Sequence, residues 1–403
     1  MPRDRFEVIL SFLHWANNED HVPRGQDGHD RLFKIRPLID LLVPKFGQFF
    51  YPGKELALDE MTIAFKGRNV MKHYNKNKPD KWGYKAYVLS ESKSAYVVDW
   101  LLSTGKGNPG QLEDDDEDEN TLTTHRIVRQ MMKPYYRQGH VVYIDSYYSG
   151  VPLANELGQN ETGVCGTVNV KRRGMPRTLN MKNLPLCKGD DPVFMRNGKL
   201  LAVAWHDVKR VSMLTNIFGN NCVMKQIRSK ESENGFRDVK KPYCVDRYNQ
   251  FMGGVDKMDQ RMKTYLFPHR STKWYPRIVS CLLSVTTVNA HILYCLKNDK
   301  PVSLKKFIQE TCISLLEGYN RPVDHTPGRT VIGDRPQRLT ERHFPTAIEE
   351  GRPDCIVCSD RNVKGGRKQT QQKCRQCDLP MHAIPCFERF HTLKDYKCCH
   401  LFL

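Results

Sequence analysis

The stretch His140-Val141-Val142-Tyr143-Ile144-Asp145 decides the fold class, because an apolar, β-forming run leads directly into an acid. A continuous apolar run of this length predicts a short strand. Ligands of α/β proteins often gather where strands end, which makes Asp145 a candidate ligand-binding residue. An ordinary turn or cap role is the alternative for a single acid in this position.

The segments around this strand alternate between strand and helix patterns. Apolar, β-tolerant runs predict strands at 55–65, 84–89, 95–102 and 163–170, and helical spacing predicts helices at 121–137 and from 152 to 157. The acidic run 113–119 is expected to be a solvated loop. Three strands, a helix, a strand, a helix and a strand make an α/β pattern with a meander at its front.

Composition shifts along the chain predict four regions. We expect a helical region at 1–54, a core at 55–300 with a β-rich insertion at about 171–240, a helix and linker at 301–352, and a cysteine-rich domain at 353–403. Within the insertion, strands are predicted near 200–205 and 211–217. The helical period returns after Tyr248 and continues to Leu296.

The formal net charge of +18 indicates a polyanionic partner, and nucleic acid is the commonest one. An anionic membrane surface or an acidic protein would also fit this charge. No run approaches the ~18 consecutive apolar residues of a membrane helix, and the first residues lack the apolar segment of a secretory signal. We therefore expect an intracellular protein with no membrane partner.

Four acids form a candidate metal site for phosphoryl transfer. Two-metal chemistry needs carboxylates from separate elements, converging on ions roughly 3.5–4 Å apart, and Mg²⁺ prefers such oxygen ligands. Asp59 lies inside the first predicted strand, Asp145 ends the fourth, and Asp256 and Asp259 share one face of a later helix that begins at Gly253-Gly254. Pairing with a nearby lysine, for Asp59, or a solvated helix face, for Asp256 and Asp259, are the alternatives. Together, the arrangement is what an RNase H-like nuclease or transposase core requires.

Ordered blocks along almost the whole chain resemble the piggyBac-type transposases. These blocks are Arg5-Phe6, Leu58-Asp59-Glu60, Phe65 to Arg68, Asn77-Lys78-Pro79, Trp82-Gly83, Asp145 with Tyr147-Tyr148-Ser149, Tyr248-Asn249, Met252 to Gln260, Lys273-Trp274, Val288-Asn289-Ala290 and Arg338 to Pro345. The resemblance implies an RNase H-like (retroviral integrase-like) core with a β-rich insertion and a small zinc-binding domain after it. It also implies a DDD catalytic set at Asp59, Asp145 and Asp256, with Asp259 as a further acid, using Mg²⁺ or Mn²⁺.

The same resemblance implies the reaction and its setting. It implies cleavage of transposon ends in double-stranded DNA, a hairpin intermediate and joining to a TTAA target, by a homodimer in the nucleus without a small-molecule substrate. Three departures from the family pattern stand out, and the first favours a fragment, an incomplete gene model or the alternative of a domesticated, catalytically silent DNA- or chromatin-binding protein. The chain begins almost at Arg5-Phe6, Ser146 stands where the family commonly has Asn, and His382 stands where its tail usually has Cys.

A basic segment follows Asp59 and is a candidate DNA-binding surface. Residues 66–85 carry seven Lys or Arg against one acid, and cationic side chains at phosphates supply most nucleic-acid affinity. The candidate contacts here and at the start of the insertion are Lys66, Arg68, Lys72, Lys76, Lys78, Lys81, Lys171, Arg172 and Arg173. Tyr74, Trp82 and Tyr84 could stack on an unpaired base or equally pack in the core. A plain solvated loop is the other alternative.

The C-terminal cysteines predict structural zinc. Half of the chain's fourteen cysteines fall in the last fifty residues, and the rest are scattered singly, as in a reduced cytosolic or nuclear protein. Two Cys-x2-Cys pairs with downstream histidines match tetrahedral zinc sites. The candidate ligands are Cys355, Cys358, Cys374, Cys377, His382, Cys386, His391 and His400, with the choice among Cys398, Cys399 and His400 left open. Eight ligands would suit two zinc ions in a cross-brace, as the family's tail implies.

Overall fold

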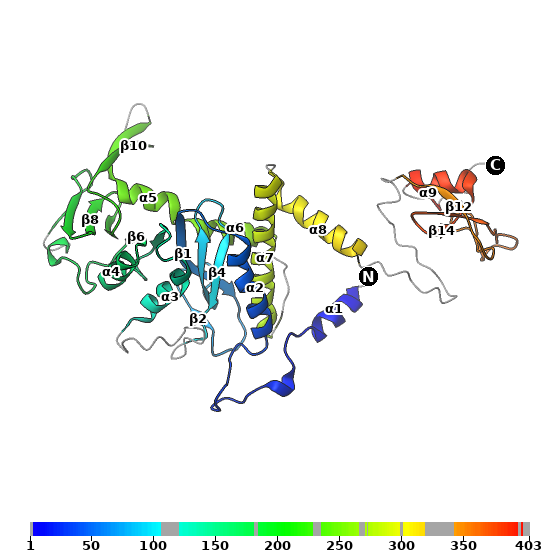
Figure 1. Ribbon diagram of the computed structural model, residues 1–403, viewed down its shortest axis with the longest axis horizontal. Helices are drawn as coiled ribbons and strands as arrows, with labels where there is room; N and C mark the ends of the chain where they lie inside the picture. Colours follow the sequence, from blue (N-terminus) through cyan, green and yellow to red (C-terminus); the bar gives the residue numbers. More distant parts are fainter. Residues whose placement is uncertain are drawn as a thin grey trace. The chain divides into compact units, whose positions relative to one another are not determined.

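A mixed β-sheet forms the centre of the first part of the chain, and its strands are the apolar runs of the sequence. β1 (Glu55–Ala64), β3 (Trp82–Glu91) and β4 (Val97–Leu102) form an antiparallel meander, with the short β2 (His73–Tyr74) at its edge. β5 (Val141–Ile144) and β6 (Gly163–Thr167) follow, both parallel to β1. The computed structural model thus confirms the predicted α/β order (Figure 1).

The predicted insertion contains more strands than the sequence suggested. β8 (Leu200–His206) and β9 (Arg210–Thr215) confirm the two predicted strands, and β7 (Val193–Asn197), β10 (Cys222–Arg228) and β11 (Phe236–Pro242) are additional. β9 pairs with β6, so β7 to β9 extend the central sheet, whereas β10 and β11 form a separate two-stranded ribbon. Short polar strands such as β10 lack the alternation that would reveal them in the sequence.

Helices cover both faces of the sheet. The helices that precede β6 are α1 (Arg3–Phe12), α2 (Arg36–Phe49), α3 (Thr123–Met132) and α4 (Val151–Gln159); those after the insertion are α5 (Tyr243–Phe251), α6 (Gly254–Thr264), α7 (Tyr275–Asn298) and α8 (Leu304–Gly318). α2, α6 and α7 lie on one side of the sheet, and α3 and α4 lie on the other (Figure 1). The main core fills the space between them and includes Leu58, Met131, Leu157 and Val285.

α7 is long and apolar enough to cross a membrane by length and composition, which the count of consecutive apolar residues did not predict. Its apolar side chains are separated by Ser, Thr and Asn, so no long uninterrupted run exists. Eight of its residues are buried, and Asn289 exchanges hydrogen bonds with the backbone of Val97 at 2.8 and 2.9 Å. These contacts are those of a helix packed into a protein core.

The structure divides the chain into two compact units, Met1–Tyr319 and Asn320–Leu403. It describes residues 3–105, 121–180, 184–228, 235–265, 271, 273–298, 301–318, 342–393 and 396–397. The acidic run 113–119, most of the predicted linker, and Cys398, Cys399 and His400 lie outside these ranges. The finer division into four domains stays a prediction.

The second unit is a small sheet with a short helix. β12 (Pro345–Ala347), β13 (Gln372–Cys374) and β14 (Leu379–Pro380) pair antiparallel, and α9 (Glu388–Thr392) follows. Its small core contains Cys355, Cys374, Cys377 and Cys386 together with Phe390. A core made largely of thiols is typical of a domain that depends on bound metal.

Candidate active site and metal centres

Parallel pairing of β1 with β5 brings two of the predicted acids to the same level. The register pairs Leu58 with Ile144, so the next residue on each strand is Asp59 and Asp145. Neighbouring strands lie about 4.8 Å apart, which places the two acids side by side. Asp145 begins the turn after β5, where its Oδ1 accepts a hydrogen bond of 2.9 Å from the Tyr147 backbone N–H.

The close approach of α6 to β1 brings the third acid. A Cβ on Gly254 would lie 2.5 Å from Ser90 Oγ and 3.3 Å from Ala57 Cβ, so only glycine allows the helix to lie this close to the sheet. Ala57 and Asp59 are two residues apart on β1 and therefore share a face. Asp256 follows in the first turn of α6 and reaches the same neighbourhood.

The electrostatics confirm that these three acids interact. Burial, together with the carboxylates of Asp145 and Asp256, raises the pKa of Asp59 to about 6, against the opposing effects of the Glu60 backbone N–H and Lys78. Burial also raises the pKa of Asp145, with Glu60 as the next unfavourable charge. Buried carboxylates that destabilise one another are what a bound cation would relieve.

In the described part of the chain the acids form no group with all ligand atoms within 4.8 Å of one another. The type of their donor atoms, and not their spacing, therefore favours a metal at the acids. Hard oxygen donors of this kind suit Mg²⁺ or Mn²⁺.

The fourth predicted acid, Asp259, lies one turn further along α6. Its Oδ2 is 2.7 Å from Lys263 Nζ, and its Oδ1 is buried without a hydrogen-bond partner. It lines a small cavity with Asp80 and Arg277. Asp259 thus lies close to Lys263 and shares a cavity with Arg277 and Asp80.

The structure adds a pair that sequence reasoning missed. Glu60 accepts from Lys85 Nζ at 2.7 Å, and the same ammonium lies 4.6 Å from the centre of the Tyr147 ring. Both charges act on Asp145, Glu60 raising its pKa and Lys85 lowering it. The Leu58-Asp59-Glu60 block contained the signal, but a sequence cannot show which strand residue faces the turn after β5.

The predicted basic segment is largely exposed and reaches the acids. Lys66, Arg68, Lys76 and Lys81 are exposed, and Lys78 is close enough to Asp59 to lower its pKa. Lys72 is partly buried, because its Nζ donates to the Gly67 carbonyl at 2.8 Å and lies 4.5 Å from the centre of the Trp82 ring. Five of these six lysine and arginine side chains thus remain available for a polyanion, and Lys72 holds an aromatic side chain.

The three basic residues at the start of the insertion, Lys171 to Arg173, also differ in exposure. Lys171 and Arg173 are exposed. Arg172 Nη2 donates to the carbonyl oxygen of Ser146 at 3.0 Å and also to that of Tyr147. Arg172 therefore braces the turn that carries Asp145, a role that its position in the sequence did not reveal.

Seven of the eight predicted zinc ligands gather in two groups of four. In the first, Cys355, Cys358, His382 and Cys386 have ligand atoms within 4.8 Å of one another. His382 Nδ1 lies 3.4 Å from Cys358 Sγ and 3.7 Å from Cys386 Sγ, so this histidine is part of the cluster. Burial raises the pKa of Cys386, helped by its neighbouring thiols, to about 12, whereas backbone N–H groups overcome burial and lower the pKa of Cys355 to about 7.

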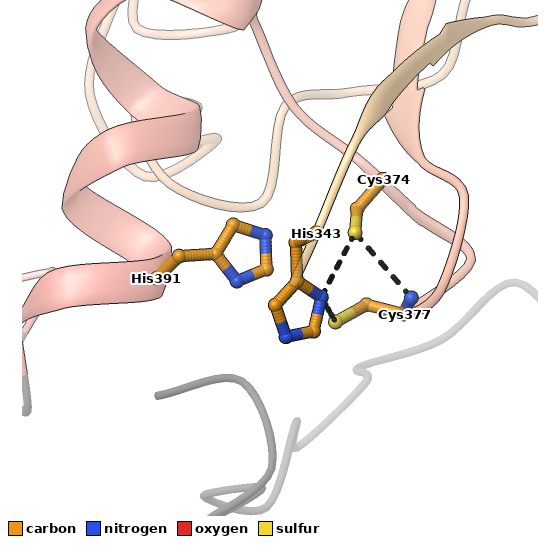
Figure 2. Close-up of side chains that lie close together, drawn as sticks. All are labelled: His343, Cys374, Cys377 and His391. Carbon is orange, nitrogen blue, oxygen red and sulfur yellow. Dashed lines mark hydrogen bonds between the residues drawn. The ribbon is translucent and has the colours of Figure 1, made fainter. Parts of the chain in front are cut away.

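The second group contains a ligand that the sequence analysis placed in the linker. His343, Cys374, Cys377 and His391 converge, and His343 Nδ1 lies 3.4 Å from each sulfur (Figure 2). The His343 and His391 rings stack with their centres 4.1 Å apart. The two groups interleave along the chain, as a cross-brace does, and could bind zinc.

The residues around His343 belong to the same small fold as the cysteines. The segment that carries His343 continues into β12, which pairs with β13, so residues 343–347 are part of the folded second unit. His400 was the eighth candidate ligand and lies outside the described residues, and the two groups are complete without it. The Arg342-His343-Phe344-Pro345 block could have signalled this ligand, but its distance from the cysteines hid it.

Comparisons with known proteins identify the family. The family described as transposase IS4 matches residues 1–291. PiggyBac transposable element-derived protein 3 of Homo sapiens is 25% identical over 401 residues, covering 97% of this chain and 63% of that protein. The chain belongs to the piggyBac transposase family.

Other members of the piggyBac family extend the comparison. PiggyBac transposable element-derived protein 2 of Homo sapiens is 26% identical over 400 residues, covering 96% of this chain and 63% of that protein. The chain thus spans under two thirds of the length of these relatives. A cryo-EM structure of the piggyBac transposase synaptic complex with hairpin DNA matches the fold with a TM-score of 0.66, at 21% identity, over 94% of this chain and 77% of that one.

Proposed function

We propose that this piggyBac-family chain is a DNA transposase of the DDD type, which cuts element ends and joins them to target DNA, with TTAA as the target. The observation that carries the proposal is the convergence of Asp59, Asp145 and Asp256 from two adjacent strands and a helix packed on them. Asp59 and Asp145 are partly buried, and burial raises the pKa of both, so holding these two carboxylates side by side has a cost that a bound cation would offset.

The strand order supports an RNase H-like core. The sequence β4-β3-β1-β5-β6, with β1, β5 and β6 parallel and the first three strands antiparallel, is the arrangement that such a core has. The acids then occupy the first strand, the fourth strand and a later helix of that core.

The roles follow from position. Asp59, Asp145 and Asp256 would hold divalent ions, and Asp259 is the further acid. When bound, two Mg²⁺ or Mn²⁺ ions would activate the attacking oxygen and stabilise the leaving one. Arg172 fixes the turn of Asp145, and Lys78 offers a cation next to Asp59 for a phosphate of the cut strand.

The partners follow from charge and from kinship. The net charge of +18 and the exposed cations beside Asp59 suit double-stranded DNA. The structural relative was solved with hairpin DNA, which supports the same substrate here. We extend the proposal to zinc in both C-terminal groups, a homodimer that holds two DNA ends, and a nuclear location.

The test is metal-dependent nicking of DNA by the purified full chain. With Mg²⁺ or Mn²⁺ we expect nicking that Asp145→Ala or Asp145→Asn lowers by roughly 100-fold or more. Asp99→Asn is the matched control, because Asp99 is another acid of the same sheet whose pKa burial raises to about 6. Equal nicking by wild type and the Asp145 variants would end the catalytic proposal.

A second function is favoured by the names of the relatives, which describe proteins derived from transposable elements. In that case the chain is a domesticated DNA- or chromatin-binding protein. Binding of DNA by the wild type, without nicking at any divalent-metal concentration, would establish this alternative.

A further inference from the structure

Two aromatic side chains near the end of β1 that lies beyond Asp59 are exposed where their neighbours are buried. Tyr74 and Trp82 face each other across β2 and β3, with ring centres 4.7 Å apart, and are 55% and 46% exposed. Tyr84, two residues along the same strand, is fully buried and stacks on Phe65. The core-packing alternative is therefore right for Tyr84 and wrong for Tyr74 and Trp82.

Tyr74 and Trp82 flank the loop 75–81, and residues of this loop lie close to Asp59 and Asp259. Asn75 N–H donates to the Lys81 carbonyl at 2.8 Å, which closes residues 75–81 into a loop. Within that loop, Lys78 acts on the charge of Asp59, and Asp80 lines a cavity with Asp259. Val88, the β3 partner of Asp59, is six residues from Trp82, which is about 20 Å along the strand, so a DNA strand extending a few nucleotides from the acids would reach the pair.

Two contacts restrain the orientation of the Trp82 ring. Lys72 Nζ lies 4.5 Å from the ring centre and is itself fixed by the Gly67 carbonyl. This cation–π contact and the cross-strand Tyr74 restrain the indole in one orientation. A ring that is oriented before binding loses less entropy when a ligand stacks on it.

The surrounding charge selects the ligand. Seven cations and one acid lie between residues 66 and 85, which suits phosphates and not an apolar protein side chain. Inside a duplex both faces of each base are already covered, so an exposed aromatic pair can add affinity only where a base is unpaired. We propose that Tyr74 and Trp82 form a stacking site for an unpaired base of the DNA strand presented to Asp59, Asp145 and Asp256.

This site rests on the proposed function for its substrate, but it can be tested separately from catalysis. The Asp145→Asn full chain, without added Mg²⁺ or Mn²⁺, is titrated with a blunt duplex and with the same duplex carrying a short single-stranded tail that contains 2-aminopurine. The parent protein should bind the tailed DNA more tightly and quench the 2-aminopurine by stacking. Trp82→Leu, which keeps an apolar contact on Tyr74, should weaken tailed DNA roughly 10-fold and change blunt-duplex binding by less than about twofold.

Matched variants keep the test decisive. Trp82→Phe should retain most of the quenching, and Tyr51→Ala is the control, since Tyr51 is 71% exposed and precedes the opposite end of β1. Equal losses on blunt and tailed DNA, no loss on either, or tighter binding of an RNA tail than of a DNA tail would overturn the stacking site. Failure of wild-type nicking would instead count against the proposed function and would leave these binding results interpretable.

Discussion

At the scale of single residues, the site contains carboxylates whose ionised form is destabilised by their surroundings. Asp59 is the clearest case, because burial and two neighbouring acids all oppose its charge. The fold keeps these acids ionised only at a cost in stability, and a bound cation would recover that cost. A group with this property belongs to a binding site more readily than to a structural core.

This electrostatic cost predicts how pH affects the binding of metal. The folded-state pKa of Asp59, about 6, lies above its ordinary value of 3.8, so its ionisation destabilises the metal-free fold progressively as pH rises through this interval. Divalent metal must displace the proton below pH about 6, so its affinity should fall roughly tenfold for each pH unit there. We expect Mn²⁺ to raise the melting temperature more at pH 7.5 than at pH 5.

Two variants separate this effect from general titration. Asp59→Asn should stabilise the metal-free protein at neutral pH and abolish the response to Mn²⁺. Asp99→Asn should also stabilise the metal-free protein, because burial raises the pKa of Asp99 to about 6, yet it should keep the response. A Mn²⁺ response that is the same at both pH values would refute this role for Asp59.

At the scale of elements, a buried ion pair ties α5 to the two strands that carry the acids. Glu55 at the start of β1 accepts from Arg247 Nη2 of α5 at 2.8 Å and from the Tyr143 hydroxyl of β5 at 3.2 Å. The side chain of Glu55 is 9% exposed, and Arg247 also lies 4.3 Å from the centre of the Phe251 ring. Because α5 leads directly into α6, this network also helps to fix the helix that carries Asp256.

Removing the arginine should therefore be costly. Arg247→Met leaves a buried, unpaired carboxylate at Glu55 and should lower the free energy of unfolding by about 3 kcal/mol, measured by chemical denaturation. Adding Glu55→Gln to that variant should recover part of the loss. Lys240→Met breaks the exposed ion pair with Asp191 and should leave stability almost unchanged, because solvent screens such pairs. Similar losses of unfolding free energy in Arg247→Met and Lys240→Met would show that the Glu55 network stabilises the fold no more than an exposed ion pair does.

At the scale of the whole molecule, the two units differ in what stabilises them. The first unit has a large apolar core around its sheet, whereas the core of the second is small and built around cysteines. Below roughly 70–80 residues a single core stabilises a domain only weakly, so small domains often use bound metals or disulfides, and zinc binding then supplies much of the folding free energy.

Metal removal should consequently unfold one unit and spare the other. A strong chelator should make residues 342–397 sensitive to protease and exchange, while residues 1–319 keep their own thermal transition. By mass spectrometry of the native chain, His343→Ala should lose one of two bound zinc ions, and His400→Ala should lose none. Retention of both ions in His343→Ala, or unfolding of both units together, would contradict this assignment.

The sequence determined by itself what depends on local patterns. Apolar runs and turn residues specified β1, β3, β4, β5 and the helices between them, and ordered motifs singled out Asp59, Asp145 and Asp256. Cysteine spacing identified seven ligands in the two C-terminal groups. Each of these signals comes from residues close together in the chain, because local backbone conformation and side-chain polarity follow directly from the local sequence.

Only the tertiary structure decided which of these residues meet. The register that sets Asp59 beside Asp145, the approach of Gly254 to Ala57, the entry of His343 into a metal group and the exposure of Trp82 above a buried Tyr84 all join or separate distant segments. Such contacts arise because the whole chain packs its apolar surface at once, so their partners are fixed by the geometry of the sheet and its helices and not by any one stretch of sequence.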